Sequence, residues 1–148
     1  MIGIGNLLMG DEGVGIHVVQ HLRKDEELHG IDLVDGGTGR FKLLNHFLNH
    51  DLVVIADAAL DQKTPGTISR LEPIYSSDYP PTLVAHDVGL KDIMDALELM
   101  GKMPKIVLFT ISIGEPEGAT LDLSPEIRSA VRPAAEKIRS YINSVVSP

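Results

Sequence analysis

The stretch Gly3–Gly15 reads GIGNLLMGDEGVG, and it decides how the rest of the chain is interpreted. Apolar residues lead into it, its glycines mark a tight turn, and a helical pattern follows. A glycine-rich turn between a strand and a helix ordinarily receives phosphate, because backbone N–H groups and the helix dipole attract anions. The adjacent carboxylates Asp11 and Glu12 would repel phosphate and attract a cation. The stretch therefore predicts a site for a metal ion or a cationic substrate group rather than for a nucleotide.

Strand and helix patterns alternate outward from this stretch. Short apolar runs predict strands, and apolar residues three and four positions apart predict helices. The expected strands are residues 1–5, 31–34, 52–56, 66–71 and 106–111, and the expected helices are residues 13–24, 41–48, 88–100 and a last one from Ser124–Pro125 to the end. This alternation predicts an α/β fold: a three-layer α/β/α sandwich with a mostly parallel, twisted sheet of about five strands and helices on both faces. Residues 66–71 are expected at an edge of the sheet, and Pro133 is expected to kink the last helix.

Composition limits what the protein binds. The 148 residues fit one domain, residues 1–148, and include no cysteine, so a metal here needs oxygen and nitrogen ligands. The formal net charge is −8, which argues against nucleic acid and anionic membranes as partners. No apolar run approaches the roughly 20 residues of a membrane span, and no signal-peptide pattern stands out. We therefore expect a cytoplasmic protein and, by default, a monomer.

Carboxylates follow three of the expected strands. Asp11 and Glu12 follow the first, Asp35 the second, and Asp57 directly follows the apolar run 52–56. In open α/β sheets, sites lie at the carboxyl ends of the strands, so we expect these acids to converge on one edge. Each also has a structural explanation. An acid at a helix start gains about 0.3–1 kcal/mol from the helix dipole, Asp57 fits a helix cap, and Asp35 fits a turn before glycines.

The histidines give weaker signals. His86 stands between an apolar run and an expected helix, where a lone histidine is more often structural than functional. His17 and His21 are four residues apart, a spacing that binds zinc in some proteins, and His46 and His50 repeat it. On its helix the first pair lies opposite the apolar stripe. We therefore expect the first pair to lie on a solvated face, and we give the second pair the same interpretation.

Two further classes of protein can be compared with the sequence. Residues 3–8 lack the third glycine of the dinucleotide-binding fingerprint G-x-G-x-x-G, although Asp35 stands where that fold places its ribose-binding acid. A serine hydrolase is not indicated, because the chain contains no G-x-S-x-G elbow. A nucleotide-binding, Rossmann-like protein is therefore kept as the weaker alternative.

An ordered set of motifs resembles the hydrogenase maturation endopeptidases and covers nearly the whole chain. The matching segments are residues 3–15, 35–38 (DGGT), 55–58 (IADA), 65–67 (PGT), 86–90 (HDVGL) and 113–116 (IGEP). The resemblance implies a single α/β/α domain that removes the C-terminal extension from the large-subunit precursor of a [NiFe] hydrogenase after nickel has been inserted. The family has several apolar residues before the first motif, where this chain has Met1 and Ile2. A short first strand, or a natural start further upstream, is therefore expected.

The resemblance also assigns residues. Glu12, Asp57 and His86 match the family's metal-contacting positions, with Asp57 and Glu12 as catalytic candidates, and Asp35 matches an aspartate near the site that is a candidate for substrate binding. The implied metal is Ni²⁺ supplied by the substrate, for which Zn²⁺ or Cd²⁺ substitutes in vitro, with no organic cofactor. Two carboxylates and an imidazole suit such an ion with positions left open. A non-catalytic metallocentre sensor that uses the same three residues is the main alternative, because it would bind the precursor without cutting it.

Overall fold

The computed structural model describes residues 1–38, 41–83 and 90–146 and contains a five-stranded sheet. Its strands lie in the order β2-β1-β3-β5-β4. Their bounds are Ile2–Gly3 for β1, Val34–Asp35 for β2, Leu52–Ala59 for β3, Ile68–Leu71 for β4 and Lys105–Ser112 for β5. All neighbouring pairs are parallel except β4 and β5, which are antiparallel. The predicted mostly parallel sheet is confirmed, as is the edge position of β4.

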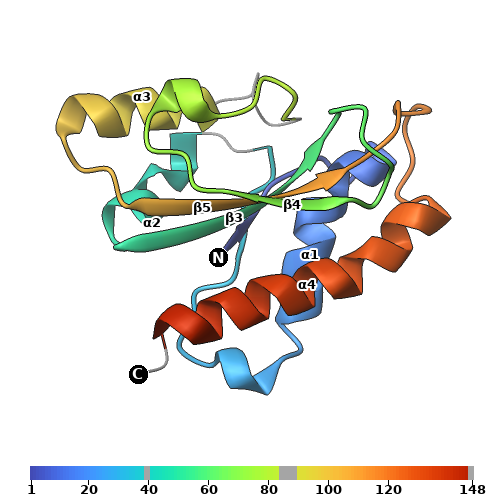
Figure 1. The fold of residues 1–148 in the computed structure, drawn as a ribbon, viewed down its shortest axis with the longest axis horizontal. Helices are drawn as coiled ribbons and strands as arrows, with labels where there is room; N and C mark the ends of the chain where they lie inside the picture. Colours follow the sequence, from blue (N-terminus) through green and yellow to red (C-terminus); the bar gives the residue numbers. More distant parts are fainter. Residues whose placement is uncertain (39–40, 84–89, 147–148) are drawn as a thin grey trace.

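Helices cover both faces of this sheet, which confirms the three-layer arrangement (Figure 1). On one face lie α1 (Val14–Leu22) and the long α4 (Pro125–Val146), and on the other lie α2 (Leu44–Leu48) and α3 (Leu90–Met100). Short 3-10 turns complete the order: η1 (Gly10–Gly13), η2 (Glu26–Leu28), η3 (Phe41–Leu43) and η4 (Ser76–Asp78). No helix within the described residues is both long enough and apolar enough to cross a membrane.

Two hydrophobic cores, one on each face of the sheet, explain the unbroken apolar runs of the central strands. Successive side chains of a strand point to opposite faces. Val54, Ala56 and Ala58 of β3 accordingly pack in the core beneath α1 and α4, whereas Val53 and Ile55 pack in the core beneath α2 and α3. Because both faces are covered, both sets of positions must be apolar.

The strand boundaries differ from the expected ones in a consistent way. β3 pairs with β5 from Leu52↔Lys105 to Ala59↔Ser112, so it continues beyond residue 56. β1 and β2 pair only through two residues each, so both are shorter than expected. Strand length therefore follows the length of the pairing partner, which is not visible in one segment alone. The prediction that Asp57 follows its strand was wrong, because Asp57 lies inside β3.

The last helix begins where the sequence predicts. α4 starts at Pro125, and the backbone N–H of Arg128 donates to the carbonyl oxygen of Ser124. Proline lacks a backbone N–H and is well suited to the first helical position. Pro133 lies within α4, which continues without interruption to Val146, and the kink at this residue stays a prediction.

Candidate active site

Two glycines allow helix α1 to lie directly on the sheet. A Cβ atom on Gly15 would lie 2.3 Å from the carbonyl oxygen of Ala56 and 2.4 Å from that of Ile4. A Cβ atom on Gly3 would lie 2.2 Å from the carbonyl oxygen of Gly15. Real side chains do not tolerate such distances, so the close approach requires glycine at both positions. The first turn of α1 is therefore held against β3 at Ala56, the residue before Asp57.

The turn that carries the two neighbouring acids folds back onto the end of β1. The backbone N–H of Asn6 donates to the carbonyl oxygen of Glu12 at 3.3 Å. A Cβ atom on Gly5 would lie 2.3 Å from the same oxygen, so this approach also depends on glycine. The backbone of Glu12 is thereby fixed beside the carboxyl end of β1, one helical turn before Gly15.

Asp11 has a structural role in this turn. Its carboxylate accepts two hydrogen bonds from Ser124, one from the backbone N–H at 2.7 Å and one from the hydroxyl at 2.8 Å. Ser124 immediately precedes α4, so the two bonds tie η1 to the start of that helix. Because the carboxylate is ionic, each bond is stronger than one between neutral groups. We call this pair of bonds the Asp11–Ser124 link.

Glu12 lies in a different environment from its neighbour. Its side chain is half-buried, and burial raises the pKa of its carboxyl above the ordinary value. Desolvation has this effect because it disfavours the charged form of an acid. A nearby cation would reverse the effect by stabilising the carboxylate. Glu12 therefore has the properties of an acid that responds to an arriving positive charge.

Asp57 is a fully buried acid in the middle of the sheet, with 0% of its surface exposed. Its carboxylate accepts a hydrogen bond from the backbone N–H of Ala58 at 2.8 Å. Alternation along β3 places Asp57 on the same face as Ile55 and Ala59, the face covered by α2 and α3. A carboxylate in such a position is costly to bury, and it is found where binding or chemistry requires it.

Asp35 lies close to the same edge of the sheet. Gly3 of β1 is paired with Asp35 on one side and with Ala56, the residue before Asp57, on the other. The predicted convergence on one edge is therefore confirmed for the backbone positions of the acids of β2 and β3, whose side chains point to opposite faces of the sheet. Asp35 is exposed, and its carboxylate accepts a hydrogen bond from the N–H of Gly37 at 2.9 Å, which is the turn predicted from the glycines that follow. The hydrogen bond explains the turn but does not test whether Asp35 binds substrate, which stays a prediction.

His86, the third residue of the predicted metal site, lies outside the described residues. Within residues 1–38, 41–83 and 90–146, no three His, Cys, Asp or Glu side chains are grouped closely enough to hold a metal ion. Because His86 lies outside these ranges, the set of Glu12, Asp57 and His86 stays a prediction.

His17 is less exposed than its position on α1 suggested. Its Nε2 atom is buried and has no hydrogen-bond partner in the described part of the chain. Burial, with a smaller effect from the charge of Arg128, lowers the pKa of His17. The expectation of a solvated face was wrong for His17, whose Nε2 atom is buried, whereas His21 is exposed as expected.

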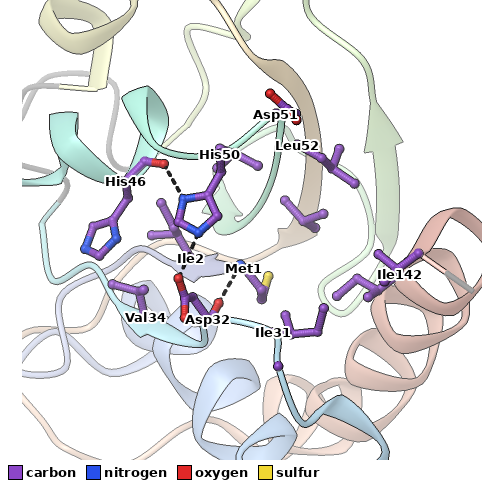
Figure 2. A pocket seen from close by; sticks show the side chains of 14 residues that line it. Met1, Ile2, Ile31, Asp32, Val34, His46, His50, Asp51, Leu52 and Ile142 are labelled. Atoms are coloured by element: carbon purple, nitrogen blue, oxygen red, sulfur yellow. Dashed lines mark hydrogen bonds and ion pairs between the residues drawn. The ribbon is translucent and has the colours of Figure 1, made fainter.

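The second histidine pair lies at the opposite edge of the sheet. The Nδ1 atom of His50 is 2.7 Å from the carbonyl oxygen of His46, and its Nε2 atom is 2.8 Å from the carboxylate of Asp32 (Figure 2). These bonds line a largely apolar pocket that includes Ile2 and Leu52, where the strands begin. His50 is half-buried and held by these two bonds, and this pocket is separate from the acids at the carboxyl edge.

The sequence did not predict that the loop between β5 and α4 contacts the turn after β1 at this edge. The N–H of Gly10 donates to the carbonyl oxygen of Thr120 at 2.8 Å, and the N–H of Thr120 donates to the carbonyl oxygen of Leu8 at 2.9 Å. The IGEP motif marked the loop without indicating its partner. Backbone pairing between segments so distant in sequence leaves no local signal in either.

Comparison with solved structures places this fold in one class, the maturation endopeptidases of hydrogenases. The hydrogenase maturating endopeptidase HybD from Escherichia coli superposes with a TM-score of 0.78 at 28% identity and covers 97% of this chain and 90% of that one. The [NiFe] hydrogenase maturation protease HybD from Thermococcus kodakarensis gives a TM-score of 0.75 at 25% identity, with 95% of each chain covered.

Sequence comparison then identifies the family. The model of the hydrogenase maturation protease family matches residues 16–141. The hydrogenase 2 maturation protease of Escherichia coli strain K12 is 30% identical over 145 residues, which are 93% of this chain and 86% of that protein. The chain therefore belongs to the hydrogenase maturation protease family, and it is a hydrolase of the endopeptidase class. The resemblance drawn from the motifs is confirmed, and the nucleotide-binding alternative is not supported.

Proposed function

We propose that this endopeptidase removes the C-terminal extension of a [NiFe] hydrogenase large-subunit precursor after nickel insertion, and that it recognises the substrate's nickel through Glu12, Asp57 and His86. The observation that carries the proposal is the fully buried carboxylate of Asp57, which directly follows Ala56, the residue of β3 whose carbonyl oxygen lies against Gly15 of α1. A buried acid in this position explains how the protease distinguishes a metal-loaded substrate from an empty one.

The discrimination follows from electrostatics. Carboxylates that share a site without a cation repel, or one of them binds a proton, and burial, which by itself raises the pKa of Glu12, adds to this cost. A nickel ion carried by the precursor relieves the cost, whereas an empty precursor does not. The preference is then a difference between two affinities, to which repulsion contributes as much as attraction.

Contact with the nickel would also place the scissile peptide bond. A water molecule attacks its carbonyl carbon, a carboxylate of the site accepts the proton of this water, and the peptide nitrogen leaves as an amine after receiving a proton. Glu12 and Asp57 are the acids available for this role. A fixed orientation of substrate and base contributes much of the rate in such reactions.

The inclusion of His86 is supported by the described residues on either side of it. Leu83 forms an antiparallel bridge with Ala59, the last residue of β3. Leu90, which opens α3, is buried in the same core as Ile55. Both anchors belong to the face of β3 on which Asp57 lies. We extend the proposal to Asp35 as a substrate contact at the exposed rim.

Cleavage of matched precursors tests the function. The protein is incubated with nickel-loaded and with nickel-free large-subunit precursor from its own genome, and the products are measured by intact mass. We expect loss of the C-terminal extension from the loaded precursor only, and a loss of rate of at least about 100-fold in Glu12→Gln, Asp57→Asn and His86→Ala. His21→Ala, on the exposed face of α1, serves as the control.

Three results would contradict the proposal. Full activity in all three variants would show that these residues are not part of the site. Equal cleavage of both precursors would show that the enzyme does not recognise the nickel. Binding of the loaded precursor without any cleavage would favour the sensor. Fractionation and sedimentation of the tagged protein test the related expectations of a cytoplasmic location and a monomer.

A further inference from the structure

The loops after β1 and β5 lie side by side at the carboxyl edge of the sheet (Figure 1), and we describe their exposed side as one joined surface. Two backbone hydrogen bonds join them, from Gly10 to Thr120 and from Thr120 to Leu8, and Met9 and Thr120 form a parallel bridge. The Asp11–Ser124 link adds two bonds further along both segments. The surface is therefore held by backbone contacts at several points and does not depend on any exposed side chain.

Two leucines project from this joined surface. Leu8 is 65% exposed and Leu121 is 67% exposed, although they come from opposite ends of the sequence. A single exposed leucine is ordinary in a folded protein. Two on adjacent hydrogen-bonded segments, next to a proposed catalytic site, form an apolar contact that a docking partner would bury.

An acidic groove adjoins the two leucines, and its negative charge favours a partner that is positively charged. It lies between the loop after β5, the turn η1 and the start of α4, and its lining includes Glu115, Glu117, Asp122 and Glu126. All four are exposed. Among the described residues that line the groove, none is a lysine or arginine. Complementary charge would steer a basic segment to this place and would do so less effectively at high salt.

We propose that Leu8, Leu121 and this groove form a docking surface for the precursor, separate from the residues that read the nickel, and that it binds a positively charged segment carrying apolar side chains. This inference rests on the proposed function. Leu8 lies four residues before Glu12 in the same loop, so a partner seated here would be next to the acids of the site. Binding energy from such remote contacts helps to hold the scissile bond in place.

The apolar contact is tested by comparing two exposed leucine positions. Leu8→Ser combined with Leu121→Ser is compared with Leu99→Ser, which alters a leucine that is 90% exposed on α3. In cleavage of nickel-loaded precursor, we expect the double variant to raise KM about tenfold, with kcat within about twofold of the wild type. Leu99→Ser should leave both constants unchanged. An unchanged KM in the double variant, or an equal rise in Leu99→Ser, would overturn the proposal.

The charge is tested by salt dependence. Raising the ionic strength from about 0.05 M to about 0.3 M should raise the wild-type KM, and the Glu117→Gln, Asp122→Asn double variant should respond less. An equal salt response of the wild type and the double variant would show that the groove is not part of the docking surface. Thermal unfolding of each variant establishes that the fold is intact, and Leu121→Ser alone provides a milder change that leaves the loop after β1 unaltered.

Failure of docking and failure of the proposed function give different results. If the wild type does not cleave the precursor, the proposed function fails. The docking surface is then tested separately, by measuring the affinity of the precursor for the wild type and for the leucine double variant. A loss of affinity of about tenfold would support the surface. Equal affinity, or a wild-type dimer that the leucine substitutions dissociate, would overturn it.

Discussion

Asp11 and Glu12 are adjacent in sequence but differ in what surrounds them. Asp11 accepts two hydrogen bonds from Ser124 and joins two elements, whereas Glu12 is half-buried with a raised pKa. The sequence predicts a pair of acids in a glycine-rich turn, and this was confirmed. It does not distinguish the two, because the partner of Asp11 lies near the other end of the chain.

A pH dependence of stability is expected from His17. Burial, and then the charge of Arg128, lower its pKa in the folded protein, so the unfolded chain binds the proton more readily below the ordinary histidine pKa of about 6.5. Stability increases with pH wherever the unfolded state binds more protons. The free energy of unfolding in urea should therefore fall as the pH drops from about 7.5 to about 5.5, and His17→Gln should reduce this fall.

The exposed neighbour of His17 on the same helix provides the control. His21→Gln should leave the pH dependence of unfolding as it is in the wild type, because this side chain is exposed. A fall of stability in His17→Gln as steep as that of the wild type would show that the buried ring does not titrate with folding.

At the scale of elements, the close contact of α1 with β1 and β3 fixes where the turn that carries Glu12 lies against the sheet. The contact depends on glycine at positions 3 and 15, where any Cβ atom would collide with backbone. The sequence predicts a glycine-rich start to this helix. The need for glycine at these two positions follows only from the packed structure, since it depends on a strand some forty residues further along the chain.

Gly15→Ala tests this contact. In an exposed helix interior, alanine is more favourable than glycine by about 1 kcal/mol. Here we expect a loss of about 1–3 kcal/mol in the free energy of unfolding, because the added methyl group would lie 2.3 Å from the carbonyl oxygen of Ala56. Cleavage should fall as well, since Glu12 moves with the helix.

Gly114→Ala is the matched control for this change. A Cβ atom there would have no described atom within 4 Å, and the residue is not in the left-handed region. Urea unfolding of the two variants checks the prediction. Equal stability of the two would show that α1 can move away from the sheet without cost, and the argument for the placement of Glu12 would then fail.

For the whole molecule, the order of strands and helices along the chain could be predicted well. The buried runs of β3 and β5 and the apolar stripes of α1, α3 and α4 are local patterns, and each reflects which face is covered. The antiparallel pairing of β4 and the joined loops at Leu8 and Thr120 were not predicted. Both depend on pairing between distant segments, which a local pattern does not record.

The central claim is that Glu12, Asp57 and His86 meet around one ion, and anomalous diffraction tests it most directly. A crystal of the protein is soaked in Cd²⁺, which stands in for the nickel of the substrate, and data are collected where cadmium scatters anomalously. We predict one strong site whose ligands are the two carboxylates and the imidazole. A cadmium site bound by other residues, or a structure in which these three side chains are too far apart to share an ion, would contradict the account.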